Sequence, residues 1–120
     1  MAKEFTVDVV TPEGVIWEGE ATFVLARTAD GEIGILADHE PTMGELVPGA
    51  AHIEGADGEM LDIALRGGFL QIHANTVTLV TDHAAIVEEG LDAARAMAAR
   101  FAHEAEQHEE ISALYETAGE

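Results

Sequence analysis

Two Asp-His dipeptides, Asp38-His39 and Asp82-His83, have the clearest capacity for chemistry in this sequence. Imidazole and carboxylate groups together bind many divalent metal ions, so a site that joined the two pairs could serve a small metal-dependent enzyme. Each dipeptide also follows a strand-like run, at a place where Asp is a common turn residue. We favour the turn interpretation and expect no metal site, and the metal-dependent enzyme stays open as an alternative class.

Other residue types that support catalysis are almost missing. The chain has no cysteine, Lys3 is its only lysine and Ser112 is its only serine. A phosphate-binding loop ending in Gly-Lys-Ser/Thr therefore cannot form, and a Ser-His-Asp hydrolase has no nucleophile in the strand-rich part of the chain. No Gly-x-Gly-x-x-Gly sequence follows a strand, so no dinucleotide site is indicated. We expect no catalytic residue and no cofactor.

The net charge of −19 restricts the partners further. Nucleic acids and anionic lipids are bound mainly by Lys and Arg, and the chain has only five of them against 24 acids. No apolar run reaches the roughly 18 residues that a membrane-spanning helix needs. We therefore expect no nucleic-acid binding and no membrane insertion. The protein is expected to be soluble or attached to a membrane-bound partner.

Residues 1–90 alternate between apolar and polar side chains with the period of two that is typical of half-buried strands. Turn sequences such as Pro12-Glu13-Gly14 and Val47-Pro48-Gly49 separate the runs. Many short strands at near-regular spacing favour a sandwich or barrel. The fold class that we predict is mainly β with an α tail: an N-terminal antiparallel β-sandwich and then a short C-terminal helical segment. The expected strands lie at 5–9, 15–17, 21–28, 33–36, 51–53, 60–65, 69–72, 77–80 and 84–88.

Residues 91–120 form the predicted helical segment, because the apolar period changes near Gly90. Asp92 is expected to be the N-cap of one main helix. Its apolar stripe is predicted to pack against the sandwich, since a stripe at helical spacing more often covers a core than binds a cofactor. A short second helical turn is expected around Ile111, Leu114 and Tyr115. The stripe consists of Ala94, Met97, Ala98, Phe101 and Ala105.

The segment from Gly31 to Leu36, Gly-Glu-Ile-Gly-Ile-Leu, followed by Asp38-His39-Glu40-Pro41, resembles a motif of the epsilon subunits of bacterial F-type ATP synthases. Supporting pieces occur in the same order as in that family, and together they cover about residues 5–100. These pieces are Val7 to Pro12, Ile16 to Gly19, Val47 to Gly49, Gly67 to Leu70 and Leu91 to Ala96.

This resemblance implies a β-sandwich with a helical C-terminal part, and a non-catalytic subunit of the central stalk of proton-transporting ATP synthase. Such a subunit binds the gamma subunit, sits on the c ring and lies near the alpha and beta subunits of the catalytic head. It is peripheral to the plasma membrane, or cell inner membrane, on the cytoplasmic side. Glu32 matches the family glutamate that faces the polar loops of the c ring, and His39 matches the histidine near the gamma and c contacts.

The resemblance also implies an alternative function as a regulatory module that senses nucleotides. In some bacterial members a Leu/Ile-Asp-x-x-Arg-Ala sequence supports ATP binding, and Asp92 and Arg95 match it. The chain departs from that pattern at Ile86, where an acid is expected, and it lacks the later arginines. Because phosphates require positive charge or ordered N–H donors, we treat this alternative as secondary.

The C-terminal segment yields the first testable prediction. Family members that inhibit ATP hydrolysis extend a second helix, often basic, toward an acidic part of the catalytic subunits. Here no Lys or Arg follows Arg100, so like charges would repel that insertion. We expect deletion of residues 101–120 to leave the ATPase rate of the assembled enzyme nearly unchanged, and a strong rise in that rate would contradict this. The acids in this segment are Glu104, Glu106, Glu109, Glu110, Glu116 and Glu120.

Overall fold

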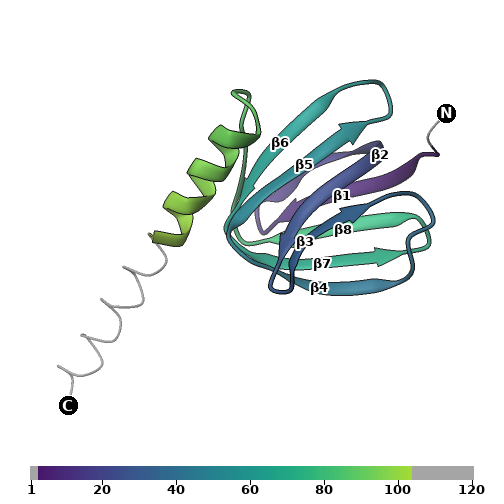
Figure 1. Ribbon diagram of the computed structural model, residues 1–120, viewed down its shortest axis with the longest axis horizontal. Helices are drawn as coiled ribbons and strands as arrows, with labels where there is room; N and C mark the ends of the chain where they lie inside the picture. The colour runs from purple at the N-terminus through teal and green to yellow at the C-terminus, as the bar shows by residue number, and fades with distance from the viewer. Residues whose placement is uncertain (1–2, 104–120) are drawn as a thin grey trace, which may run out of the picture.

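The computed structural model describes residues 3–103. Its strands are arranged as two stacked layers, with one helix beside them (Figure 1). Within the described residues no helix is long and apolar enough to cross a membrane. The strands are β1 (Phe5–Thr11), β2 (Gly14–Thr28), β3 (Gly31–Ile35), β4 (Thr42–Leu46), β5 (Gly49–Gly55), β6 (Met60–Leu65), β7 (Gly68–His73), β8 (Thr76–Thr81) and β9 (Ala84–Ile86).

β2 belongs to both layers. Its first half pairs with β1, which continues through β8 and β7 to β4, and its second half pairs with β3 and β5, which leads on to β6 and β9. The two apolar inner faces meet between these layers, as expected for a sandwich. The predicted β-sandwich is therefore confirmed.

Alternating burial along the strands explains why this sequence folds in two layers. In β1 and β5, every second residue is buried and those between them are half-buried. Most of the large, fully buried side chains of the core are Val and Ile, whose β-branched carbons suit a pleated surface, and the others include Leu65, Leu70 and Leu79. Among the described residues, no buried side-chain N or O atom lacks a hydrogen-bond partner.

Several features of the strands differ from the sequence-based expectation. The runs expected at 15–17 and 21–28 form the single strand β2, and β4 was not anticipated, because its sequence Thr-Met-Gly-Glu-Leu has little β-branched character. β1 pairs in parallel with β8, so the sandwich is not wholly antiparallel. The strand expected at 33–36 ends at Ile35, and Leu36, which lies beyond it, is 61% exposed.

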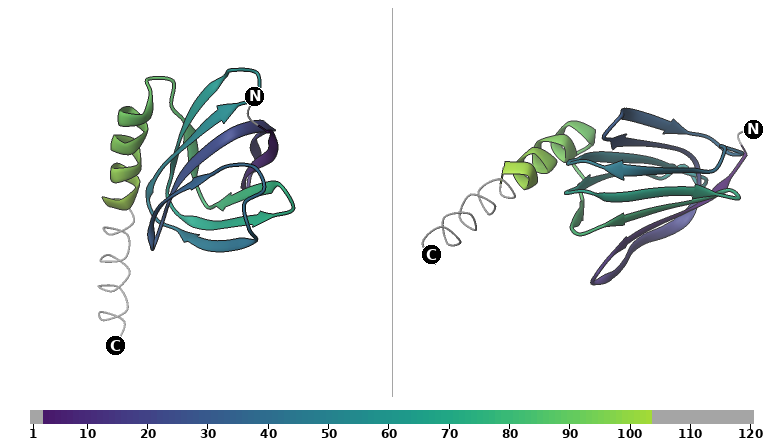
Figure 2. Two further views of the ribbon diagram at one scale, coloured as in Figure 1. Left: turned by 45° about the vertical axis from the view of Figure 1, so that its right-hand side comes forward. Right: turned by 90° about the horizontal axis from the view of Figure 1, so that it is seen from below.

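A C-terminal helix covers the outer side of the β5–β6–β9 layer (Figure 2). It begins at Leu91 and continues to residue 103, the last one described. The amide of Ala94 donates to the carbonyl of Gly90 at 3.0 Å, so Gly90 precedes the helix and the prediction that Asp92 is the N-cap was wrong. Asp92 lies instead in the first turn, where a carboxylate is favoured by the helix dipole.

The apolar stripe of this helix packs on the sandwich, as predicted. Ala94, Ala98 and Phe101 are buried with Ala64 of β6 and with Val87. Small side chains on both sides allow the helix to lie close to the sheet. Ala105 and the second helical turn expected around Ile111, Leu114 and Tyr115 lie outside the described residues.

Gly68 provides a direct test of this fold. It opens β7 with φ at +130°, and a Cβ atom there would overlap the Val80 carbonyl and lie 2.8 Å from the Thr81 Cα. We expect Gly68→Ala to lower the free energy of unfolding by about 2–4 kcal/mol, because backbone strain and overlap act together. The measurement is chemical denaturation.

Gly58→Ala is the matched control, because its φ is +91° but nothing lies within 4 Å of the added Cβ. This variant should lower the free energy of unfolding by only about 1 kcal/mol, because the left-handed backbone conformation is its only source of strain. Equal losses for the two variants would show that the close approach of β7 to β8 is not the constraint.

Candidate functional site

The two residues expected to contact partner subunits lie toward opposite ends of β3. Glu32 is near its start, opposite Arg27 of β2, and His39 lies in the loop between β3 and β4. An extended strand advances about 3.3 Å per residue, so Glu32 is roughly 10 Å from Ile35 even before that loop begins. The structure therefore does not gather Glu32 and His39 into one site. It presents them as two separate surfaces.

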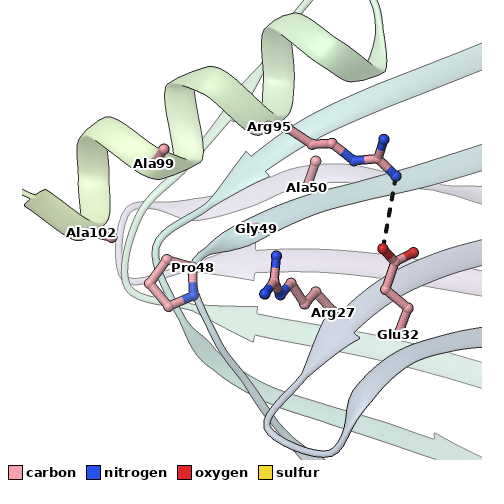
Figure 3. Close-up of a pocket in the computed structure, with 8 residues that line it drawn as sticks. All are labelled: Arg27, Glu32, Pro48, Gly49, Ala50, Arg95, Ala99 and Ala102. Carbon is pink, nitrogen blue, oxygen red and sulfur yellow. Dashed lines mark ion pairs between the residues drawn. The ribbon is translucent and has the colours of Figure 1, made fainter.

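Glu32 is brought together instead with the residues expected to bind a nucleotide. Figure 3 shows its carboxylate directed toward Arg95 of the C-terminal helix, and the closest N–O distance is 3.9 Å. Arg95 also lies 3.8 Å from the Asp92 carboxylate one turn earlier. About half of the Arg95 and Glu32 side-chain surface is exposed, so water screens this pair strongly. The contact therefore orients the helix more than it stabilises it.

A small cavity lies beside this ion pair (Figure 3). Its volume is about 150 Å³, and two arginines, Arg27 and Arg95, share its lining with Glu32. Cavities that enclose drug-sized ligands usually have about 300–1,000 Å³. With the helix docked, this cavity therefore offers room for a small anionic group but not for a whole nucleotide. The other lining residues are Pro48, Gly49, Ala50, Ala99 and Ala102.

The loop that carries His39 is held by a hydrogen-bond network centred on Asp38. Lys3 donates to both Asp38 carboxylate oxygens, at 2.8 and 2.9 Å, and the Asn75 side-chain amide donates to one of them at 2.9 Å. The hydrogen bond from Lys3, and to a smaller extent that from Asn75, holds the pKa of the Asp38 carboxyl below its ordinary value of 3.8. The stabilisation from this network is therefore complete above that ordinary value, and it is lost only as the pH falls through the lowered pKa.

His39 follows Asp38 in that loop and is half-buried. Its Nδ1 atom lies 2.9 Å from the carbonyl oxygen of Glu40 and 3.5 Å from the hydroxyl of Thr42, the first residue of β4. The imidazole is thus fixed beside the edge of the β4 strand, where it can take part in a contact between subunits.

The two Asp-His dipeptides are not joined in this structure. Asn75, which contacts Asp38, precedes β8, whereas Asp82 follows it, and this six-residue strand spans roughly 20 Å. Asp82 pairs with Arg66 at 3.1 Å, and the His83 ring packs edge-on against Phe101, with 4.7 Å between centroids. Within residues 3–103 no group of three or more metal-binding side chains is present. Each dipeptide instead contacts its own separate set of neighbours.

An exposed apolar patch, made of Met43, Phe69 and Val80, lies on the outer side of the layer that contains β4, β7 and β8. These side chains are 74%, 60% and 48% exposed. Phe69 is directly opposite Val80, and Met43 is diagonal to Phe69, because its own partner is Gln71. Side chains this close act as one surface. A contiguous apolar patch on an otherwise acidic protein is typical of a contact with another protein.

Sequence reasoning missed this patch and the contacts of Asn75. The patch could not be recognised because β4 was not predicted, so Met43 had no assigned face. Asn75 carried a usable signal: it stands in a two-residue connection between strands, where Asn readily adopts positive φ. Its partner Asp38 is 37 residues away, and only the fold brings them together.

Comparisons with known proteins agree with this fold. Residues 4–87 match the family described as ATP synthase, Delta/Epsilon chain, beta-sandwich domain. The ATP synthase epsilon chain of Rhodococcus opacus is 44% identical over 98 residues, which is 80% of each chain. That of Corynebacterium efficiens is 43% identical over 96 residues, which is 79% of this chain and 77% of the relative.

Two solved structures share the fold. One is a chain of the Euglena gracilis mitochondrial ATP synthase, in a structure of OSCP, F1 and the c ring. It has a TM-score of 0.67 and 27% identity, over 72% of this chain and 56% of that one. The other is a chain of the Tetrahymena thermophila central stalk and c ring, with a TM-score of 0.59 and 19% identity, over 70% of this chain and 67% of that one. The family match over residues 4–87 and the similarity to the epsilon chains show that the chain belongs to the delta/epsilon family of ATP synthase chains.

Proposed function

We propose that this chain is a non-catalytic coupling subunit in the central stalk of a proton-transporting ATP synthase. It binds the gamma subunit through the apolar patch. It binds the c ring through the Glu32 surface, which consists of Glu32 with Arg27 and Arg95 beside it. Rotation of the ring is thereby passed toward the alpha and beta subunits. The complex holds it peripherally on the cytoplasmic side of the plasma membrane. The apolar patch is the single observation that carries this proposal.

The patch suits the gamma subunit because its apolar side chains stand beside polar ones. Glu45 is opposite Phe69, and Gln71 is opposite Met43. In an interface of this kind the aromatic side chain is excluded from water, and the polar neighbours fix the orientation. His39 lies next to Thr42, the residue before Met43 of the patch. This position agrees with the role that the resemblance implies for His39.

Glu32 suits a different partner because it is exposed and close to two arginines. The resemblance assigns it to the polar loops of the c ring. An acid flanked by Arg27 and Arg95 can bind a loop that carries charges of both signs. Polar contacts of this kind give orientation and specificity more than affinity. A coupling subunit needs these two surfaces on one rigid body, and it needs no reactive group.

The patch predicts the outcome of an interface mutation. Phe69→Asp should weaken binding of the gamma subunit from the same organism by about 30-fold, because a buried aromatic anchor commonly accounts for about 2 kcal/mol or more. Binding is measured by co-purification and then by calorimetric titration of the purified subunits.

Met60→Asp is the matched control. Met60 is 60% exposed, as Phe69 is, and it lies on β6 in the other layer. This variant introduces the same charge at the same exposure but should bind gamma as the unaltered chain does. The proposal would be contradicted if both variants lost the same affinity for the gamma subunit, or if the unaltered chain did not bind gamma.

The nucleotide-sensing alternative at Asp92 and Arg95 predicts a different outcome. The cavity beside Arg95 is favourable for an anion, but it is small and Glu32 already faces it. We therefore expect isothermal titration with Mg-ATP to give no binding heat. Heat that is abolished by Arg95→Ala would support the alternative function instead.

A further inference from the structure

The loop between β3 and β4 adopts a backbone conformation that its residues do not favour by themselves. Asp38, at its centre, has a φ of 64°, in the left-handed region that most residues avoid. Asp tolerates this region better than most because its short side chain can form local hydrogen bonds. Here those bonds come from outside the loop, so the conformation of the loop depends on a distant part of the chain.

Asn75 provides those bonds. Its side-chain oxygen accepts a hydrogen bond from the Asp38 backbone amide at 2.6 Å, and its side-chain NH2 group donates to the Asp38 carboxylate at 2.9 Å. One amide group thus satisfies both the backbone and the side chain of the same residue. Lys3 donates to both oxygens of that carboxylate, including the one that Asn75 contacts. The loop is fixed at Asp38, directly before His39.

Asn75 is itself held firmly by the sandwich. It lies with Ala74 in the two-residue turn between β7 and β8, closed by the pair His73 and Thr76. Both turn residues have positive φ, 48° and 60°, as a tight hairpin of the primed type requires. The Asn75 carbonyl also accepts from the Thr6 amide at 2.9 Å. The loop is therefore anchored to a rigid corner of the fold.

We propose that Asn75 and Asp38 are positioning residues that hold the β3–β4 loop, and with it His39, in the geometry that binds the partner subunit. This inference rests on the proposed function, in which His39 lies at the gamma contact. A loop fixed before binding loses less conformational freedom when the complex forms. Neither residue needs to touch the partner to affect the affinity.

The test compares two glycine substitutions in the same turn. Asn75→Gly keeps a residue that readily adopts positive φ but removes the amide, and Ala74→Gly makes the same backbone change while keeping Asn75. We expect Asn75→Gly to weaken gamma binding about tenfold. Ala74→Gly should bind within about twofold of the unaltered chain, and the midpoint of thermal unfolding should be similar for both.

Nuclear magnetic resonance on the free chain gives a readout that does not depend on a partner. In Asn75→Gly, the amide signals of residues 36–41 and the His39 imidazole signals should broaden or shift, while those of β5 and β6 stay in place. Ala74→Gly should leave the loop signals unchanged. This separates positioning of the loop from general stability.

Asp38 offers a second pair of variants that does not alter the turn. Asp38→Asn keeps an oxygen that can accept from the Asn75 amide, and it should retain more affinity than Asp38→Ala, which must hold positive φ without that bond. Unchanged loop signals in Asn75→Gly, or equal affinity of the two Asp38 variants, would overturn the inference. Failure of the unaltered chain to bind gamma would count against the proposed function alone, because the loop signals are measured without gamma.

Discussion

β2 is the constraint on which the rest of the structure depends, because one continuous strand supplies hydrogen bonds to both layers. Its first half holds β1, and its second half holds β3 and β5. A strand shared in this way keeps the two sheets from sliding past each other, and their inner faces then bury a common core. β3 follows β2 after a two-residue turn and pairs with it antiparallel, so Glu32 and the loop that carries His39 are attached to the rigid sandwich.

The proposed coupling function requires this rigidity. The apolar patch and the Glu32 surface belong to different parts of one body, and the strands between them do not stretch. A force applied at one surface is therefore transmitted to the other. The C-terminal helix packs through small residues on the opposite layer from the patch and leaves the patch uncovered.

Much of the fold could be predicted from local patterns, and much of the site could not. The alternation in β1 and the hairpin of β5 and β6 follow from residues near one another in sequence, so their periodicity was sufficient. The Gly31 to Leu36 segment identified the family because its motif is local. β4 was missed because Met43 and Gly44 follow no strand pattern, and the parallel pairing of β1 with β8 joins residues about 70 apart. The Asp38–Asn75 and Glu32–Arg95 contacts also join residues that are far apart in the sequence, so local patterns could not predict them.

Hydrogen–deuterium exchange of this chain, free and within the assembled synthase, tests the central claim most directly. If the chain couples partners through the two surfaces described, assembly should slow exchange in residues 42–46, 68–73 and 76–81, and in the segment around Glu32 and His39. Exchange in the β5–β6 hairpin, residues 49–65, should be unchanged. Protection confined to that hairpin, or no protection on assembly, would contradict the account.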